Sequence, residues 1–259
     1  MNPWGLQDMA AYRGAAERLV QGQPLYPPPG PILDSSDVYR YAPWFALLWV
    51  PLVAVPESWV AAGWSLVLVA ASIGAVLPLL RDRQPLPVSL AVLGFVLCLR
   101  AAAIGKVEPL MVAALVHGVE RRSGPLWIAL AASLKVGPLA LVLVYIGRGE
   151  WARVAWTALL TAAFVAPMLL FDLSHYRTEA GASMSLLALA GPLPWIAAVC
   201  VAGAVTVLVA RTRWAWPAAC VTALLALPRL GFYNLPLLLV GAAGGANRRH
   251  SPSAGSASR

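Results

Sequence analysis

The sequence predicts an all-α protein in which a bundle of helices crosses a lipid bilayer several times. Hydrophobic residues make up 60% of the 259 residues and charged residues only 12%, about half the charged share of globular proteins. A water-soluble domain of this length needs more polar side chains to cover its surface. Apolar runs long enough to cross about 30 Å of hydrocarbon recur along the chain. Inside lipid such runs must be helices, because the backbone has to satisfy its own hydrogen bonds.

The first 58 residues are expected to form a loop outside the membrane that carries two amphipathic helices. Residues Asp8–Val20 repeat with a helical period, which predicts a helix lying flat on the membrane surface. The segment Pro43–Val55 is apolar but too short to cross, and it predicts a second, juxtamembrane helix with Trp44 and Trp49 near the lipid headgroups. The apolar face of the first helix is expected to hold Ala11, Tyr12, Ala15, Ala16, Leu19 and Val20.

Residues 59–246 are predicted to form the transmembrane bundle, and residues 247–259 a disordered, basic cytoplasmic tail. Arginine clusters lie between the apolar runs, and short cytoplasmic loops collect such residues. With these clusters inside, the cytoplasmic side holds 11 of the 19 Lys and Arg residues but only three acids. Residues 1–58 then lie on the non-cytoplasmic face of a cell membrane. The predicted spans are Trp59–Leu80, Leu86–Leu99, Val107–Val119, Trp151–Phe171, Pro192–Ala210, Trp214–Leu227 and Phe232–Gly245.

One further apolar segment, Pro125–Gly147, has arginines at both of its ends, so it should begin and end on the same side. The pair Gly137–Pro138 lies in its middle, and proline removes an amide donor and clashes with the preceding turn. We therefore expect two half-helices that enter and return, with Lys135 near the apex. The alternative is one continuous helix, which puts Arg148 and Arg153 outside.

The net charge of +8 does not indicate a nucleic-acid-binding protein. The arginines lie as pairs between hydrophobic runs, whereas nucleic-acid binding calls for basic residues on one face. Cys98, Cys200 and Cys220 lie in apolar segments without the spacing of a metal site, and they are expected to be small buried hydrophobic side chains. Membrane lipids are therefore expected partners, and nucleic acid is not.

Asp8 is the first candidate for chemistry. It begins the predicted surface helix, and Tyr12 lies one turn later on the same face. An aspartate at this position is also a favoured helix N-cap, and from its position alone the cap is the simpler interpretation.

Further motifs resemble a known family of membrane enzymes. The outer loop contains Asp8-Met-Ala-Ala-Tyr12, Gly22-Gln-Pro-Leu-Tyr26 and Tyr39-Arg-Tyr-Ala-Pro43, and downstream lie Leu134-Lys135-Val-Gly-Pro138 and Arg229-Leu-Gly-Phe-Tyr233-Asn234. Together they resemble the polyprenyl-phosphate-sugar-dependent mannosyltransferases of glycosyltransferase family 87, which have the GT-C fold. The resemblance covers roughly residues 5–240, and the motif of the outer loop is its most specific part.

The resemblance implies that Asp8 is the catalytic base, which takes the proton of an acceptor hydroxyl as it attacks. The donor is then a polyprenyl-phosphate sugar, with mannose expected, and attack opposite the phosphate inverts the anomeric centre. The acceptor is a glycolipid or a glycan, and no metal or other cofactor is implied. Asp34 and Asp37, two loop carboxylates, do not make a ligand set by themselves.

The phosphate of such a donor needs positive partners. Lys135 is the first candidate, because a charge at membrane depth is costly and usually functional; a lysine that only reaches toward the interface is the alternative. The other substrate-binding candidates are ordinary interfacial or solvated side chains in the alternative interpretation. They are Lys106, Arg100, Arg177 and Arg229 for the phosphate, and Tyr12, His175, Tyr233 and Asn234 for other parts of the substrates.

The sequence departs from the family pattern in three places. The family has a membrane helix before the catalytic loop, whereas this chain begins at the loop, which implies a misplaced start, a fragment or a lost helix. The Gly-Gln-x-Asn motif of the family is replaced by Gly105-Lys106-Val107-Glu108, and family members are typically longer at the C-terminus. Two other functions therefore stay open: a transporter or flippase, favoured by the broken segment around Lys135, and a non-catalytic subunit of a membrane glycosylation complex.

Overall fold

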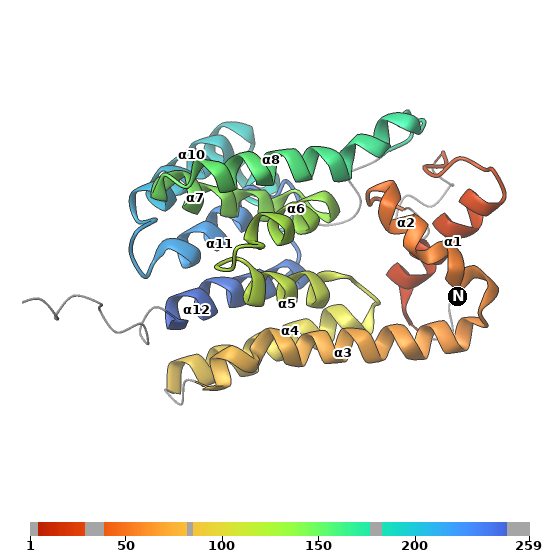
Figure 1. The fold of residues 1–259 in the computed structure, drawn as a ribbon, viewed down its shortest axis with the longest axis horizontal. Helices are drawn as coiled ribbons and strands as arrows, with labels where there is room; N and C mark the ends of the chain where they lie inside the picture. The colour runs from red at the N-terminus through yellow and green to blue at the C-terminus, as the bar shows by residue number, and fades with distance from the viewer. Residues whose placement is uncertain (1–4, 29–38, 82–84, 177–182, 248–259) are drawn as a thin grey trace, which may run out of the picture.

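The computed structural model describes residues 5–28, 39–81, 85–176 and 183–247, and every regular element within these ranges is helical. The predicted all-α class is therefore confirmed. Most of the helices run side by side in one bundle (Figure 1). The expected tail from residue 248 onward and Arg177 lie outside the described residues.

Each apolar run predicted from the sequence coincides with a helix of the bundle. The helices pack α3 on α4 and α5, α6 on α8, and α11 on α10 and α12, around a core that includes the buried rings of Tyr145 and Trp216. The bundle elements are α3 (Glu57–Arg81), α4 (Pro85–Ala103), α5 (Glu108–Gly118), α6 (Gly124–Leu134), the 3₁₀-helix η2 (Gly137–Leu141), α7 (Val142–Arg148), α8 (Trp151–Val165), η3 (Ala166–Leu170), α9 (Leu186–Ala190), α10 (Pro192–Leu208), α11 (Ala215–Leu225), η4 (Phe232–Leu237) and α12 (Leu238–Asn247).

Two segments are long and apolar enough to cross a membrane: α3, and α8 together with η3. Their mean hydropathies are 2.1 and 1.6. Only 6% of the apolar window in α8 and η3 is buried within the protein, so this segment differs from the core helix of a water-soluble domain. Leu159, Leu169 and Leu170 are among its outward-facing side chains.

The segment from Gly124 to Arg148 reverses direction. The Tyr145 hydroxyl donates a hydrogen bond to the Val119 carbonyl oxygen at 2.6 Å, and Arg148 forms an ion pair with Glu120 at 3.1 Å, so both ends of the segment lie together. The helix α6 ends at Leu134, and the backbone of Lys135 is extended (φ −148°, ψ 126°) before η2 and α7 return. The predicted chain reversal at Lys135 is confirmed, and the single continuous helix is wrong.

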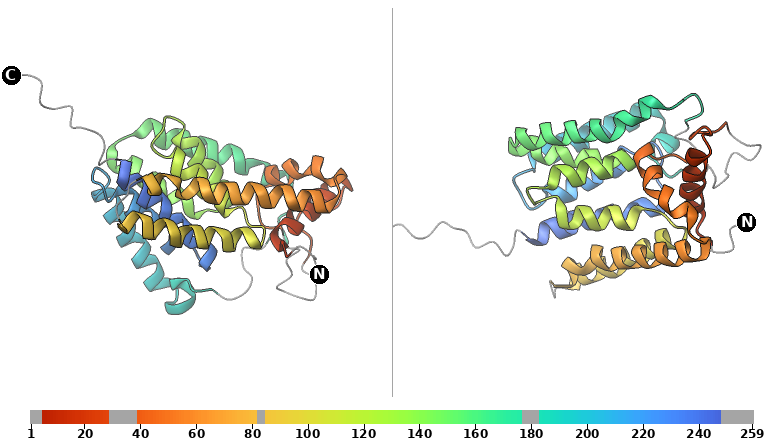
Figure 2. Two further views of the ribbon diagram at one scale, coloured as in Figure 1. Left: turned by 90° about the horizontal axis from the view of Figure 1, so that it is seen from below. Right: turned by 45° about the vertical axis from the view of Figure 1, so that its right-hand side comes forward.

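The helices α1 (Gln7–Val20) and α2 (Pro43–Trp49), with the 3₁₀-helix η1 (Val50–Ala54), lie across one end of the bundle (Figure 2, right). The two helices predicted between residues 8 and 55 are therefore present. The buried face of α1 holds Met9, Ala11, Tyr12, Ala15 and Ala16, which pack on α2 and η1 in a second hydrophobic cluster. Val20, expected on that face, is instead 61% exposed at the last residue of α1, whereas the neighbouring Leu19 packs against the cluster.

Trp44 and Trp49, expected near the lipid headgroups, both make contacts within the protein. The ring of Trp49 is buried, with its centroid 5.3 Å from that of Tyr12 and 5.0 Å from that of Trp64. The Trp44 indole nitrogen donates a hydrogen bond to Ser133 Oγ at 3.2 Å. Both indoles fasten α2 to other helices, because a short helix gains more from burying these large rings than from exposing them.

Candidate functional site

The first turn of α1 rests on the connection between α4 and α5. The Asp8 amide donates a hydrogen bond to the Ile104 carbonyl oxygen at 3.0 Å. Gly105 has φ +80°, in the region that favours glycine, and a Cβ added there would lie 3.0 Å from the Met9 amide nitrogen. The Trp64 indole donates to the Gly105 carbonyl oxygen at 2.9 Å and holds the connection from the other side. This close contact brings Lys106 next to Asp8.

Asp8 is held by three side chains. The Lys106 ammonium lies 3.0 Å from Oδ2 and 3.1 Å from Oδ1 of Asp8, and the hydroxyls of Tyr12 and Tyr41 donate to Oδ2 at 3.5 and 3.4 Å. The side chain of Asp8 is 22% exposed, so the carboxylate is held in place yet reachable from outside.

The interpretation of Asp8 as a helix cap is wrong. The N-cap residue of α1 is Leu6, and no side chain caps the helix. Asp8 lies in the first turn, where its negative charge is stabilised by the positive end of the helix dipole. Its oxygens are occupied by Lys106 and the two tyrosines and not by the amides of its own helix.

A second ion pair lies close to the first. Lys135, where α6 ends, contacts Glu108 Oε1, and Glu108 is in the first turn of α5. The Glu108 side chain is 1% exposed, and its second oxygen, Oε2, has no hydrogen-bond partner. A carboxylate this deeply buried is stable only because a cation accompanies it.

The ring of Tyr233 in η4 joins the two ion pairs. The Lys106 ammonium lies 4.3 Å from the centroid of this ring, and the Lys135 ammonium lies 4.7 Å from it. Both distances are within the range of cation–π attraction. Asp8, Lys106, Glu108, Lys135 and Tyr233 therefore form one cluster, called here the paired-lysine site, beneath α1.

The environment of the paired-lysine site shifts several pKa values. Burial lowers the pKa of Lys106, but the carboxylates of Glu108 and Asp8 together raise it by more, so its pKa is above the usual 10.5. Burial first, and then the neighbouring Tyr41, Asp8 and Glu108, raise the pKa of Tyr12 well above the usual 10. For Tyr41, burial and then Glu108 and Asp8 have the same effect. Lys106 is therefore charged, and both tyrosines are neutral donors, throughout the physiological range.

The predicted site residues divide into two groups. The structure brings Asp8, Tyr12, Lys106, Lys135 and Tyr233 together from four separate parts of the chain. Asn234 is buried beside Tyr233, donates to the Arg229 carbonyl oxygen at 3.4 Å, and leaves its own Oδ1 without a partner. Arg229 is half-buried, and its Nε also has no partner.

Two other predicted residues do not join the site. His175 lies exposed in the turn after Asp172, and Arg100 is exposed near the end of α4. Among the described residues, neither makes a hydrogen bond or an ion pair with the paired-lysine site. Their exposed positions allow contact with a substrate, but the geometry of the site does not support a role for either side chain.

Glu108, a member of the site, and Tyr41, which contacts it, are not predicted as functional residues from the sequence. Glu108 is only a departure from a family motif, and Tyr41 only lies within the motif Tyr39-Arg-Tyr-Ala-Pro43. The signal for Glu108 was present, because an apolar run that begins with an acid can pair with the lysine of another apolar run. Tyr41 carried no comparable signal, since its hydroxyl reaches Asp8 only through the packing of α1 on α2.

Comparisons of the chain with protein-family models, with curated proteins and with solved structures found no match. The family resemblance therefore rests on the motif residues of the sequence alone. Within the described part of the chain, no three His, Cys, Asp or Glu side chains gather as a metal-binding group.

Proposed function

We propose that this protein is an integral membrane glycosyltransferase that transfers a sugar, expected to be mannose, from a polyprenyl-phosphate donor to a glycolipid or glycan acceptor with inversion. The observation that carries the proposal is the convergence of Asp8, Lys106 and Lys135 around Tyr233. A carboxylate that can accept a proton and two cations that can meet a phosphate are the groups that this reaction needs.

A membrane location is supported by the outward-facing apolar surface of the bundle. Large side chains such as Leu169, Leu193 and Leu208 are about 80% exposed. Exposed apolar area costs roughly 25 cal/mol per Å² in water, and lipid removes that cost. The paired-lysine site then lies at one face of the membrane, beneath α1, and the arginine-rich connections lie at the opposite face, as expected from the positive-inside rule.

The transfer needs one proton acceptor and one stabilised leaving group. The acceptor hydroxyl oxygen forms a bond to the anomeric carbon, and its proton passes to the Asp8 carboxylate. The bond from that carbon to the phosphate oxygen breaks, and its electron pair leaves with the polyprenyl phosphate. Lys106 and Lys135 stabilise the departing negative charge. The incoming phosphate also offers Lys106 a new anionic partner, which releases Asp8 to act as the base.

The test is transfer of labelled mannose from a polyprenyl-phosphate donor to a glycolipid acceptor by the purified protein in lipid nanodiscs. Asp8→Asn is expected to lower the rate by at least about 100-fold, while Glu17→Gln on the same helix keeps it. Glu17 is a matched control, since its carboxylate pairs with Arg13 and, among the residues that the structure describes, with no member of the site. Equal activity of the wild type and Asp8→Asn would remove Asp8 as the base.

A transporter or flippase is the second candidate, favoured by the break in the chain at Lys135. Discontinuous helices that carry an ionisable residue are typical of transporter binding sites. Proteoliposomes decide between the two, because movement of a polyprenyl-phosphate sugar without a glycosylated product supports transport. Transfer only in the presence of a co-purifying larger enzyme supports the remaining candidate, a non-catalytic subunit.

A further inference from the structure

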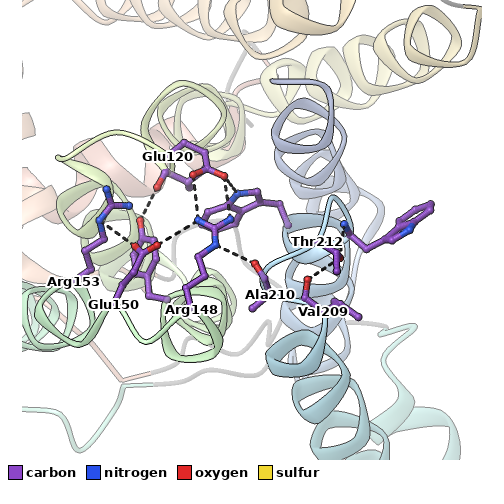
Figure 3. Close-up of polar contacts among 11 residues, drawn as sticks. Glu120, Arg148, Glu150, Arg153, Val209, Ala210 and Thr212 are labelled. Atoms are coloured by element: carbon purple, nitrogen blue, oxygen red, sulfur yellow. Dashed lines mark hydrogen bonds and ion pairs between the residues drawn. The ribbon is translucent and has the colours of Figure 1, made fainter. Parts of the chain in front are cut away.

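The end of the bundle opposite α1 is held together by Arg148. Its two terminal nitrogens pair with both oxygens of Glu120 at 3.1 and 3.2 Å, and its Nε donates to the Ala210 carbonyl oxygen at 3.0 Å (Figure 3). These three residues belong to three separate connections: α5 to α6, α7 to α8, and α10 to α11. The Arg148 side chain is only 8% exposed, so it serves as an internal clamp.

The acids at this end are occupied. Glu120 pairs with Arg148 and also accepts a hydrogen bond from the Trp216 indole. Glu150 pairs with Arg153 at 3.2 Å and lies 3.8 Å from Arg148 (Figure 3). Within the described residues of these three connections, Arg148 and Arg153 therefore neutralise both carboxylates.

Four other arginines on the same connections point outward. Arg121 and Arg122 lie in the turn between α5 and α6, and Arg211 and Arg213 in the turn between α10 and α11; all four are exposed. The second turn is fixed by Thr212, whose Oγ1 donates to the Val209 carbonyl oxygen at 2.8 Å (Figure 3). We call these four residues the arginine face.

Exposed tryptophans border the arginine face. Trp151, at the start of α8, is 64% exposed, and Trp214, at the start of α11, is 57% exposed. The Arg213 guanidinium lies 5.3 Å from the centroid of the Trp214 ring. Tryptophan prefers the level of the lipid headgroups, and arginine binds phosphate through its planar array of donors. The helices leading away from this border, α8 and α10, are apolar and outward-facing.

We propose that the arginine face is a binding surface for the headgroups of anionic phospholipids in the leaflet that it meets. Arg148 links the connections on which the four cations lie, and the nearby Glu120 and Glu150 form ion pairs with Arg148 and Arg153. Phosphate diesters with a net negative charge fit this arrangement, whereas zwitterionic headgroups also bring a positive group that the arginines repel. The proposal does not depend on the glycosyltransferase function, since these residues belong to the other end of the bundle.

The experiment uses the full chain in nanodiscs that contain equal amounts of phosphatidylglycerol and phosphatidylcholine. Native mass spectrometry counts the lipids that the released protein retains. The wild type is expected to enrich phosphatidylglycerol. Arg121→Gln/Arg122→Gln or Arg211→Gln/Arg213→Gln is expected to lower that enrichment roughly 30-fold, from about 1 kcal/mol for each of the two arginines removed. Arg211→Lys/Arg213→Lys should retain most of it, because the charge is kept.

The single variants Arg211→Gln and Arg100→Gln form a matched pair, because both residues are exposed arginines near the ends of helices but lie at opposite ends of the bundle. Melting temperatures in phosphatidylcholine alone check that the variants are folded. The proposal is overturned if the wild type retains both lipids equally, or if Arg100→Gln lowers the enrichment as much as Arg211→Gln does. Loss of the enrichment at about 1 M salt, where the Debye length is about 3 Å, supports the electrostatic cause.

Discussion

Lys106 Nζ lies within 3.1 Å of both carboxylate oxygens of Asp8, a residue 98 positions away in the sequence. The contact ties α1 to the connection between α4 and α5. Asp8, the proposed base, is therefore positioned by the same lysine that would release it in the proposed reaction.

The first prediction concerns the strength of this pair. Lys106→Met should lower the free energy of unfolding by about 1–3 kcal/mol, because it leaves the half-buried Asp8 carboxylate without its strongest partner. In the Lys106→Met variant, Asp8→Asn should lower the free energy of unfolding by less than it does in the wild type. A double-mutant cycle should therefore give a coupling energy of about 0.5–3 kcal/mol. Thermal unfolding in detergent gives all four values.

The matched comparison is the pair Arg13–Glu17, on the same helix but with Glu17 41% exposed. Its coupling energy should be only about 0.3–0.5 kcal/mol. Similar coupling energies for the two pairs would contradict a special role for Lys106.

The second prediction concerns Glu108, which lies almost fully buried beside Lys135. Glu108→Gln should destabilise the protein by about 3 kcal/mol or more, because it leaves a lysine without its counter-charge in an apolar region. The double variant Glu108→Gln/Lys135→Met should be more stable than Glu108→Gln alone. Glu57→Gln, an exposed acid in the first turn of α3, should change stability by less than about 0.5 kcal/mol.

If Glu108→Gln is instead more stable than the wild type, the carboxylate is retained for function and not for the fold. The transfer assay then separates the two cases, since loss of activity without loss of stability points to the chemistry of the site.

The sequence was sufficient to predict most of the helices, because the hydropathy and charge of a segment reflect whether its surroundings are apolar or polar. The helices from α3 to α8 and from α10 to α12, and the reversal at Lys135, follow from local features: apolar length, arginine pairs and a Gly-Pro break. Partners were harder to predict. Lys106 was one cation among several, and only the packing of Gly105 on Met9 brings it to Asp8.

The same distinction applies to contacts that the sequence did not predict. Trp44 and Trp49 were expected to meet lipid headgroups, and the fold brings them into contact with Ser133 and Trp64. Asp8 has the sequence position of a cap, but Lys106 and two tyrosines compete successfully for its oxygens. In each case a tertiary contact determines the position of the side chain, and no local pattern in the sequence predicts that contact.

The third prediction tests the close approach of α1 and the α4–α5 connection. Gly105→Ala should destabilise the protein by about 1–3 kcal/mol, because an alanine at φ +80° is strained and its Cβ would press on Met9. It should also lower any transfer rate, since Asp8 and Lys106 lie on the two sides of this contact. Gly63→Ala in α3 is the control: a Cβ there has no neighbour within 4 Å, and it should be neutral or slightly stabilising.

The fourth prediction concerns alkaline pH. The folded-state pKa values of Lys106, Tyr12 and Tyr41 are raised, so the folded protein holds these protons more tightly than the unfolded chain does. Their contribution to stability is fully present below the unfolded values, about 10 for tyrosine and 10.4 for lysine, and it is lost as the pH rises through the folded values. The unfolding free energy should therefore fall above about pH 10.

The measurement is thermal unfolding from pH 7 to 11 for the wild type, Lys106→Met and Tyr12→Phe/Tyr41→Phe. Each variant should lose less stability above pH 10 than the wild type does. A wild-type decline that is unchanged in both variants would assign the alkaline sensitivity to other groups.

The last prediction concerns the clamp at the other end. Arg148→Lys keeps the charge but removes the planar donors that bind both oxygens of Glu120 and the Ala210 carbonyl oxygen together. Lysine cannot replace this geometry, so a loss of about 2–4 kcal/mol is expected. Arg121→Lys, an exposed neighbour in the turn that follows Glu120, should change stability by less than about 0.5 kcal/mol. If both substitutions prove equally mild, the three connections are held by helix packing and not by Arg148.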